Sequence, residues 1–110
     1  MYEYRAHVTK VYDGDTVTVD IDLGFGIWLK KQSIRLVNID TPEIRGEERE
    51  HGLIVRDIVA EKVLDKDITL RTHKDSKGKY GRWLGEVIME DGTNLNEWLL
   101  YEGYADPYGS

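Results

Sequence analysis

The sequence predicts an α+β domain, mainly β, in which five strands form a small barrel accompanied by two helices. Five short runs either alternate between apolar and polar residues or are apolar throughout. Two segments with apolar residues at helical spacing follow, one after the third run and one after the fifth. A chain of 110 residues has room for one core, so we expect a single domain over residues 1–110.

The N-terminal half is predicted to form three strands. Residues 4–11 alternate between polar and apolar side chains, and residues 17–23 do the same. The Asp-Gly dipeptide between them is typical of a hairpin turn. After a longer connection, residues 34–39 predict the third strand, which Pro42 ends because proline lacks the N–H that a strand ladder needs.

The C-terminal half is predicted to contain two helices and two more strands. Residues 46–51 are polar and expected to form a loop, whereas residues 53–64 carry apolar side chains at helical spacing. Short runs at 68–71 and 83–89 predict the fourth and fifth strands, and residues 95–102 predict the second helix.

The second helix has recognisable signals at both ends. Asn94 or Thr93 can cap its N-terminus, and Gly103 follows its last turn. Five short strands with a helix after the third and another after the fifth are typical of a closed barrel of the OB type. Such barrels often present one face to oligonucleotides.

Composition excludes several classes of function. The absence of cysteine excludes disulfides, thiolate metal sites and a cysteine nucleophile. No apolar run approaches the ~20 residues of a membrane-spanning helix. The start of the chain shows no secretory signal, so we expect no membrane partner and favour the cytoplasm.

The net charge of −6 disfavours tight binding of nucleic acid. Residues 1–82 hold all 15 basic residues and 15 of the 21 acidic ones, so the excess acidity is confined to residues 83–110. A bound divalent cation would add positive charge that the formal count omits. We therefore expect weak, metal-dependent binding of nucleic acid.

Three polar stretches stand where the strand patterns stop. They are Asp13-Gly14-Asp15-Thr16, Asp40-Thr41-Pro42-Glu43 and Tyr80-Gly81-Arg82. Taken alone, each is typical of a turn or a helix start. Arg35 is harder to explain in this way, because it lies inside a predicted strand and a buried guanidinium needs acceptors.

Together these residues match the needs of phosphodiester hydrolysis, which are an activated water, neutralised phosphate oxygens and a stabilised leaving oxygen. Asp15 and Asp40 can hold a hard cation such as calcium, with the backbone carbonyl of Thr41 and waters completing its shell. Glu43 can orient or deprotonate the attacking water. Two arginines from different strands can grip the phosphate oxygens in the transition state.

In order and spacing these residues resemble the staphylococcal nuclease (thermonuclease) family, with this chain as a short homologue lacking the family's C-terminal helix. The resemblance runs from about Tyr4 to Ala105 and rests on four stretches: Asp13 to Thr16, Arg35, Ile39 to Glu43, and Asp75 through Lys79 to Arg82. It implies an OB-fold barrel and a calcium-dependent nuclease, which cuts the P–O5′ bond of DNA or RNA and leaves 3′-phosphate ends.

The resemblance also assigns the metal site. Asp15 and Asp40 correspond to the family's calcium-binding carboxylates, and Thr41 to its backbone-carbonyl ligand. Glu43 corresponds to the proposed general base, and Asp13 to a carboxylate just outside the metal's own ligands.

The remaining assignments concern the substrate. Arg35 and Arg82 correspond to the family's phosphate-gripping arginines. Lys79 and Tyr80 correspond to residues that contact the end phosphate of a bound nucleotide.

The chain departs from the best-known family pattern in three places. The hairpin Leu23–Lys31 is longer, and the loop after Glu43 is shorter and differently charged. The sequence ends at Ser110 where the family usually adds a helix, so we expect lower stability and either a monomer or a weak homodimer. The family's nucleotide-stacking tyrosines near the C-terminus have only one loose counterpart in this chain, Tyr108.

Several alternatives stay open at this stage. Trp28, followed by Lys30 and Lys31, either contacts nucleic acid or is an ordinary surface residue. Residues 45–50 form either a solvated loop or a flap beside the metal. A non-catalytic OB-fold module that binds nucleic acid is the alternative function, and a purely structural or protein-interaction domain is a further one. Neither the choice between DNA and RNA nor the mode of attack, internal or from an end, follows from the sequence.

Overall fold

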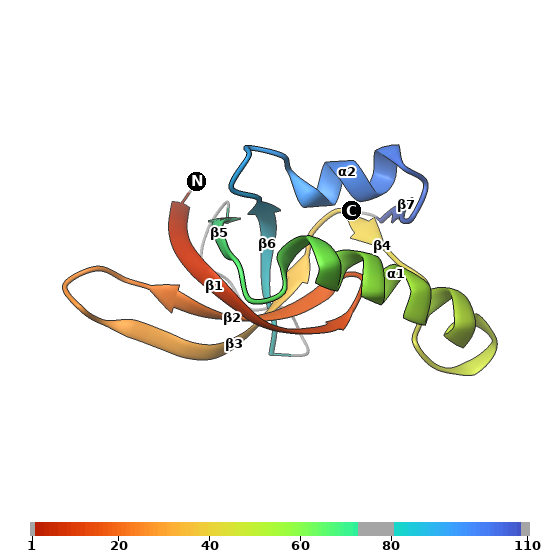
Figure 1. Cartoon of the computed structure of the whole chain (residues 1–110), viewed down its shortest axis with the longest axis horizontal. Coiled ribbons are helices and arrows are strands. Elements are labelled where there is room, and N and C mark those ends of the chain that lie inside the picture. The colour runs from red at the N-terminus through yellow and green to blue at the C-terminus, as the bar shows by residue number, and fades with distance from the viewer. Residues whose placement is uncertain (1, 73–80, 109–110) are drawn as a thin grey trace.

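The predicted barrel is present in the computed structural model, which describes residues 2–72 and 81–108 (Figure 1). Five strands close in the order β1-β2-β3-β6-β5. They are β1 (Tyr2–Asp13), β2 (Thr16–Asp22), β3 (Trp28–Leu36), β5 (Asp67–Thr72) and β6 (Trp83–Ile88). Around them lie the 3-10 helix η1 (Gly46–Glu48), the helices α1 (Arg49–Val63) and α2 (Leu95–Tyr101), and the short strands β4 (Ile39–Asp40) and β7 (Asp106–Pro107).

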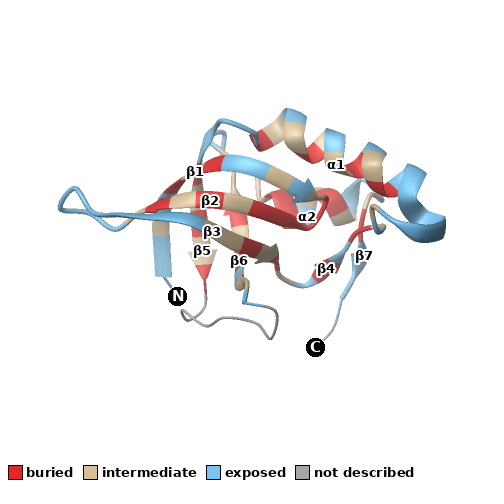
Figure 2. Ribbon diagram, turned by 90° about the horizontal axis from the view of Figure 1, so that it is seen from below, coloured by how far each residue is buried: buried red, intermediate tan, exposed pale blue. Residues whose placement is uncertain are grey.

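The barrel core follows from the two sequence periods. In β2, Val17 and Val19 point inward and are fully buried, whereas Thr18 and Asp20 on the other face are partly exposed. In α1, Val55, Val59 and Val63 recur every fourth residue and are likewise fully buried. Figure 2 shows the buried face of α1 turned toward the barrel, where the helix contacts β1.

One pairing in the barrel is parallel and the others are antiparallel. β3 runs alongside β6 in the same direction, with Ile34 opposite Trp83 and Arg35 opposite Leu84. The neighbouring pairs β1–β2, β1–β5, β2–β3 and β5–β6 are antiparallel. The parallel pair places the first three residues of β6 beside the last three residues of β3.

The third strand differs from the prediction at both ends. β3 begins at Trp28 instead of residue 34. The sequence did not predict this early start, because the first four residues of the strand are exposed and do not alternate between apolar and polar side chains. It stops at Leu36, since Asn38 adopts a positive φ of 70° and turns the chain. Residues 39 and 40 form the separate strand β4, which pairs with β7.

The predicted loop over residues 46–51 is wrong in its second half. η1 occupies Gly46–Glu48, and α1 starts at Arg49, four residues earlier than expected. No side chain caps either helix, and the first turn of α1 is polar, so neither a cap nor an apolar period marked the start.

The second helix largely agrees with the prediction. Asn94 is its cap and accepts a hydrogen bond from the backbone N–H of Glu97 at 3.1 Å. Trp98 packs against the core and its ring centroid lies 5.7 Å from that of Tyr104. The helix ends at Tyr101, two residues before Gly103.

Candidate active site

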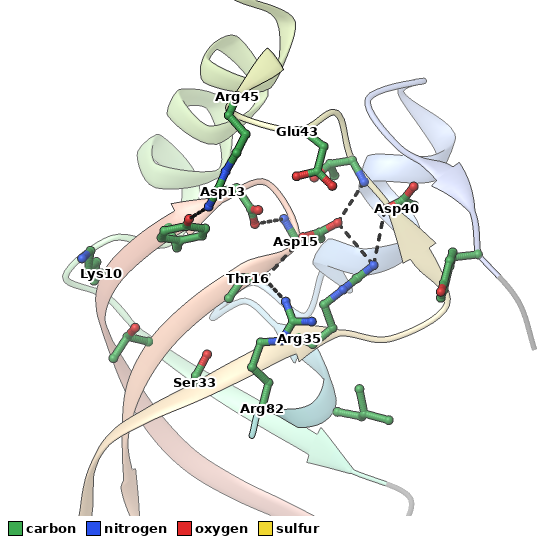
Figure 3. A pocket seen from close by; sticks show the side chains of 15 residues that line it. Lys10, Asp13, Asp15, Thr16, Ser33, Arg35, Asp40, Glu43, Arg45 and Arg82 are labelled. Atoms are coloured by element: carbon green, nitrogen blue, oxygen red, sulfur yellow. Dashed lines mark hydrogen bonds and ion pairs between the residues drawn. The ribbon is translucent and has the colours of Figure 1, made fainter. Parts of the chain in front are cut away.

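One pocket of about 1130 Å³ lies where the β1–β2 turn, the end of β3, β4 and the start of β6 meet (Figure 3). It contains every residue with a predicted metal or catalytic role. Its charged lining residues are Lys10, Asp13, Asp15, Arg35, Asp40, Glu43, Arg45 and Arg82. Four acidic and four basic side chains from separate parts of the chain therefore face one cavity.

Asp15 stands at the centre of the pocket and is only 6% exposed. Its backbone N–H donates to Asp13 Oδ1 at 3.2 Å, which holds the Asp-Gly turn. Its Oδ2 accepts the backbone N–H of Thr41 at 3.0 Å. The turn between β1 and β2 is thereby joined to the segment just after β4.

Gly14 is required at this junction by space. A Cβ there would stand 2.7 Å from Val55 Cγ1 and 2.8 Å from Thr41 Oγ1. These distances are shorter than real Cβ contacts. The absence of a side chain lets α1, the turn and the Thr41 segment approach one another closely.

Arg35 finds the acceptors that its burial requires. Its Nη1 donates to the backbone carbonyls of Leu36 at 2.6 Å and Ile39 at 2.9 Å. Its Nη2 lies 3.4 Å from Asp15 Oδ2 and 3.5 Å from Asp40 Oδ1. The guanidinium is fixed by two carbonyls and still presents its edge to the carboxylates.

Arg82 and Glu43 approach the same space from other elements. Arg82 immediately precedes β6, and its Nη1 donates to Thr16 Oγ1 at 3.2 Å. Glu43 follows β4 and is exposed; its backbone N–H donates to Glu48 Oε1 at 3.1 Å. In Figure 3 the Glu43 carboxylate lies on the far side of Asp15 from Arg82.

Burial and neighbouring negative charge raise the pKa values of two acids in the pocket. Burial, together with the hydrogen bond and negative charge of Asp15, raises the pKa of Asp13 from 3.8 to about 7. Burial and the charge of Asp15 also raise the pKa of Asp40, although Arg35 opposes this shift. The nearby cations do not fully compensate the negative charge, so an additional cation would be stabilised here.

The donor set fits a hard divalent cation. Asp15 and Asp40 offer carboxylate oxygens, and Thr41 beside them is buried, with an Oγ1 that has no hydrogen-bond partner in the described residues. Oxygen ligands in small number, completed by water, suit calcium or magnesium. Within residues 2–72 and 81–108 no group of three or more His, Asp or Glu side chains could hold a metal, so such an ion would also need backbone or solvent oxygens.

Of the predicted site residues, the structure brings seven to this pocket: Asp13, Asp15, Arg35, Asp40, Thr41, Glu43 and Arg82. The predicted substrate residues Lys79 and Tyr80 lie outside the described residues. Lys10 and Tyr12 also line the pocket and were not predicted to do so; Arg45 lines it as well and belongs to residues 45–50, for which a flap beside the metal was one of two expectations. The outward positions of Lys10 and Tyr12, two residues apart on β1 and next to the Asp-Gly turn, were the available signal.

The C-terminal segment also contributes to the pocket. Tyr108 lies against it, with Arg35 Cζ 5.5 Å from the centre of its ring. Its backbone N–H donates to the carbonyl of Asn38 at 2.9 Å, continuing the β4–β7 pairing.

No helix in the described part of the chain is long and apolar enough to span a bilayer.

Comparison with known proteins agrees with this geometry. The model of the family described as "Staphylococcal nuclease homologue" matches residues 33–109. An uncharacterized endonuclease of Escherichia coli O157:H7 is 34% identical over 96% of this chain and 62% of its own length. Thermonuclease of Staphylococcus hyicus is 31% identical over 94% of this chain and 59% of its own length. Endonuclease YhcR of Bacillus subtilis is 34% identical over 96% of this chain, which covers 9% of that protein. The chain thus spans less than two thirds of each of these relatives.

Proposed function

This chain belongs to the family of staphylococcal nuclease homologues, and on that premise we propose that it is a calcium-dependent nuclease. Its reaction would be hydrolysis of DNA or RNA at the P–O5′ bond, leaving 3′-phosphate ends. One observation carries the proposal: Asp15, Asp40 and Glu43 face the same cavity as Arg35 and Arg82, although they come from separate stretches of chain. The names of the relatives, two endonucleases and a thermonuclease, support it.

The arginines bind and orient the scissile phosphate. Arg35 is held by the carbonyls of Leu36 and Ile39, so its charge is fixed before substrate arrives. Arg82 immediately precedes β6 and is held by its hydrogen bond to Thr16 Oγ1. Fixed cations on two sides of a phosphate stabilise the charge that develops on its equatorial oxygens, with little reorganisation.

Glu43 acts as the base. Its exposed carboxylate takes a proton from a water molecule, the water oxygen forms a bond to phosphorus, and the P–O5′ bond breaks. O5′ leaves with the bonding electron pair and receives a proton from solvent. The backbone hydrogen bond from Glu43 to Glu48 holds the segment that carries this base.

Asp15 and Asp40, with the backbone carbonyl of Thr41, would hold the calcium ion, with Asp13 behind them. When bound, calcium supplies positive charge that polarises the phosphate and favours ionisation of the attacking water. Asp15 is already oriented by the N–H of Thr41, so its carboxylate needs no rearrangement. Burial, and after it the charge of Asp15, raises the pKa values of Asp13 and Asp40, and the cation would offset that charge.

The alternative of a non-catalytic nucleic-acid-binding module is less well supported. Binding alone requires cations, but it does not require three carboxylates beside them, which repel phosphate. The burial of Asp15 among them is costly unless it serves a cation or a proton transfer.

A nuclease assay with single-stranded DNA and with RNA tests the proposal. We expect cleavage in calcium, no cleavage in excess chelator, and products that end in a 3′-phosphate. Glu43→Gln is expected to lower kcat by about 10²-fold or more, because it removes the base. Glu50→Gln is the matched control, since Glu50 is exposed and does not line the pocket. Undiminished cleavage in chelator would remove the calcium assignment, and normal turnover of Glu43→Gln would remove the mechanism.

A further inference from the structure

The pocket does not end at the carboxylates but continues along the outer face of β1. Lys10 and Tyr12 form this part of the wall from β1, and Arg45 covers it from the loop before η1. In Figure 3, Lys10 and Arg45 both lie on the side of Asp15 that faces away from Asp40. The cavity of about 1130 Å³ exceeds the ~1,000 Å³ at the upper end of pockets for drug-sized ligands. It therefore has room for more than one phosphodiester group.

Arg45 and Tyr12 are joined by a hydrogen bond. Arg45 Nη2 donates to the phenol oxygen of Tyr12 at 2.8 Å. This contact orders two exposed side chains that belong to different elements. It engages one of the five N–H groups of the guanidinium, so the others can bind a ligand.

The charges in this part of the pocket are not neutralised by the protein. Neither Arg45 nor Lys10 forms an ion pair with a carboxylate in residues 2–72 and 81–108. Arg35 differs, because Asp15 and Asp40 both lie within 3.5 Å of it. Two cations that face a cavity without a counter-ion favour an anionic ligand there.

Tyr12 adds an aromatic surface beside these cations. The residue is 41% exposed, and its hydroxyl is held by Arg45, so the ring keeps one orientation at the pocket wall. An ordered aromatic ring next to cations is the combination that binds single-stranded nucleic acid, because a base stacks on the ring while the phosphate contacts the charge.

We propose that Lys10, Tyr12 and Arg45 form a second nucleotide-binding site, which holds the nucleotide next to the scissile phosphate of a single-stranded substrate. Arg45 and Lys10 bind its phosphate, and the ring of Tyr12 stacks on its base. This inference rests on the proposed function, since it assigns the site to the same polynucleotide. It makes a chain that extends to both sides of the scissile bond the preferred substrate, and thus favours internal cutting.

Equilibrium binding tests the site without requiring catalysis. Fluorescence anisotropy of a labelled single-stranded oligonucleotide is measured in chelator with wild type, Arg45→Ala, Tyr12→Ala and Arg49→Ala. Loss of either site residue is expected to weaken binding about tenfold. In Arg45→Ala the slope of log K against log salt concentration should become shallower by about 0.7, the value for one lost phosphate contact with a single strand. Arg49→Ala removes the same charge four residues later, outside the pocket, and should leave both values unchanged.

A kinetic arm uses two substrates in calcium. The variants should raise KM for the oligonucleotide about tenfold, while hydrolysis of bis(4-nitrophenyl) phosphate, which carries no neighbouring nucleotide, should stay at the wild-type rate. Wild-type protein that does not bind the oligonucleotide, or Arg45→Ala that matches Arg49→Ala in affinity and salt slope, overturns the second site. Weaker binding by the site variants supports it even when no cleavage is seen. Absence of cleavage by wild type counts against the nuclease assignment alone.

Discussion

Replacing Gly52 by alanine is expected to impair the pocket through contact with its backbone. Gly52 is buried in the first turn of α1, directly beneath the segment that carries Glu43. A Cβ at this position would stand 2.0 Å from the carbonyl oxygen of Glu43 and 2.9 Å from the backbone nitrogen of Ile44. Ordinary contact begins at 3.4 Å, so helix and segment must separate by 3.4 Å less 2.0 Å, or about 1.4 Å.

Two magnitudes follow from that displacement. A shift of about 1 Å in a catalytic group can cost about 10²-fold in rate, so kcat should fall by about this factor or more. Stability should change less, because alanine gains about 1 kcal/mol over glycine in a helix, against about 1–3 kcal/mol lost to overpacking. The net loss of unfolding free energy is therefore at most about 2 kcal/mol.

The assay combines turnover of single-stranded DNA in calcium with urea unfolding of the same samples. Ile54→Ala serves as the control, since Ile54 is 57% exposed on the same helix and lies outside the pocket. It should retain wild-type kcat. A Gly52→Ala protein that folds and turns over at the wild-type rate would show that the close approach of α1 to the segment of Glu43 does not govern catalysis.

Three further predictions concern charge, metal and packing. The folded-state pKa of Asp13 is raised to about 7 from 3.8, so the folded protein binds the proton of this carboxyl more tightly than the unfolded chain does. The stability that this protonated carboxyl contributes is therefore lost as pH rises from about 4 through about 7. In chelator, urea unfolding should therefore show Asp13→Asn gaining stability relative to wild type between about pH 5 and about pH 8, and a constant difference would contradict the raised pKa. Calcium at a hundredfold excess over its Kd should add about 2.7 kcal/mol to the unfolding free energy, and Asp40→Asn should abolish this gain whereas Asp57→Asn, on the exposed face of α1, should keep it. Asn96→Ala should cost about 2–4 kcal/mol and lower Tm by about 10 °C or more, because the buried side chain of Asn96 accepts a hydrogen bond from Val87 N–H and donates to the carbonyls of Val37 and Gly85, and all three bonds would be lost; a calorimetric Tm within a few degrees of wild type would contradict it.

Local patterns predicted the elements that have one buried face. β2 and most of α1 follow periods of two and nearly four residues, because each places apolar side chains against a single core. The start of β3 escaped prediction, since the strand leaves the barrel there and both faces of residues 28–31 are exposed. β7 has only two residues, one of them Pro107, and exists because β4 offers it a partner.

The same distinction applies to the pocket. Asp15, Asp40 and Arg35 were predictable because each stands where a strand pattern stops or is interrupted by a charge. The contact between Tyr12 and Arg45 was not, because it joins residues 33 positions apart through an exposed loop without a periodic pattern. The tight approach of Gly52 to Glu43 was equally hidden, since a helical glycine in sequence does not reveal which backbone it meets.

The parallel alignment of β3 with β6 has a consequence for the synthesis of this protein. Arg82 reaches Thr16 only after β6 has docked, and β6 is the last strand of the barrel to leave the ribosome. A nascent chain that has been made only as far as β5 would thus carry Asp15, Asp40 and Glu43 without Arg82. On the proposed function, the nuclease is synthesised beside messenger and ribosomal RNA. It stays inactive until β6 pairs with β3, so the strand order prevents cleavage of these RNAs during translation.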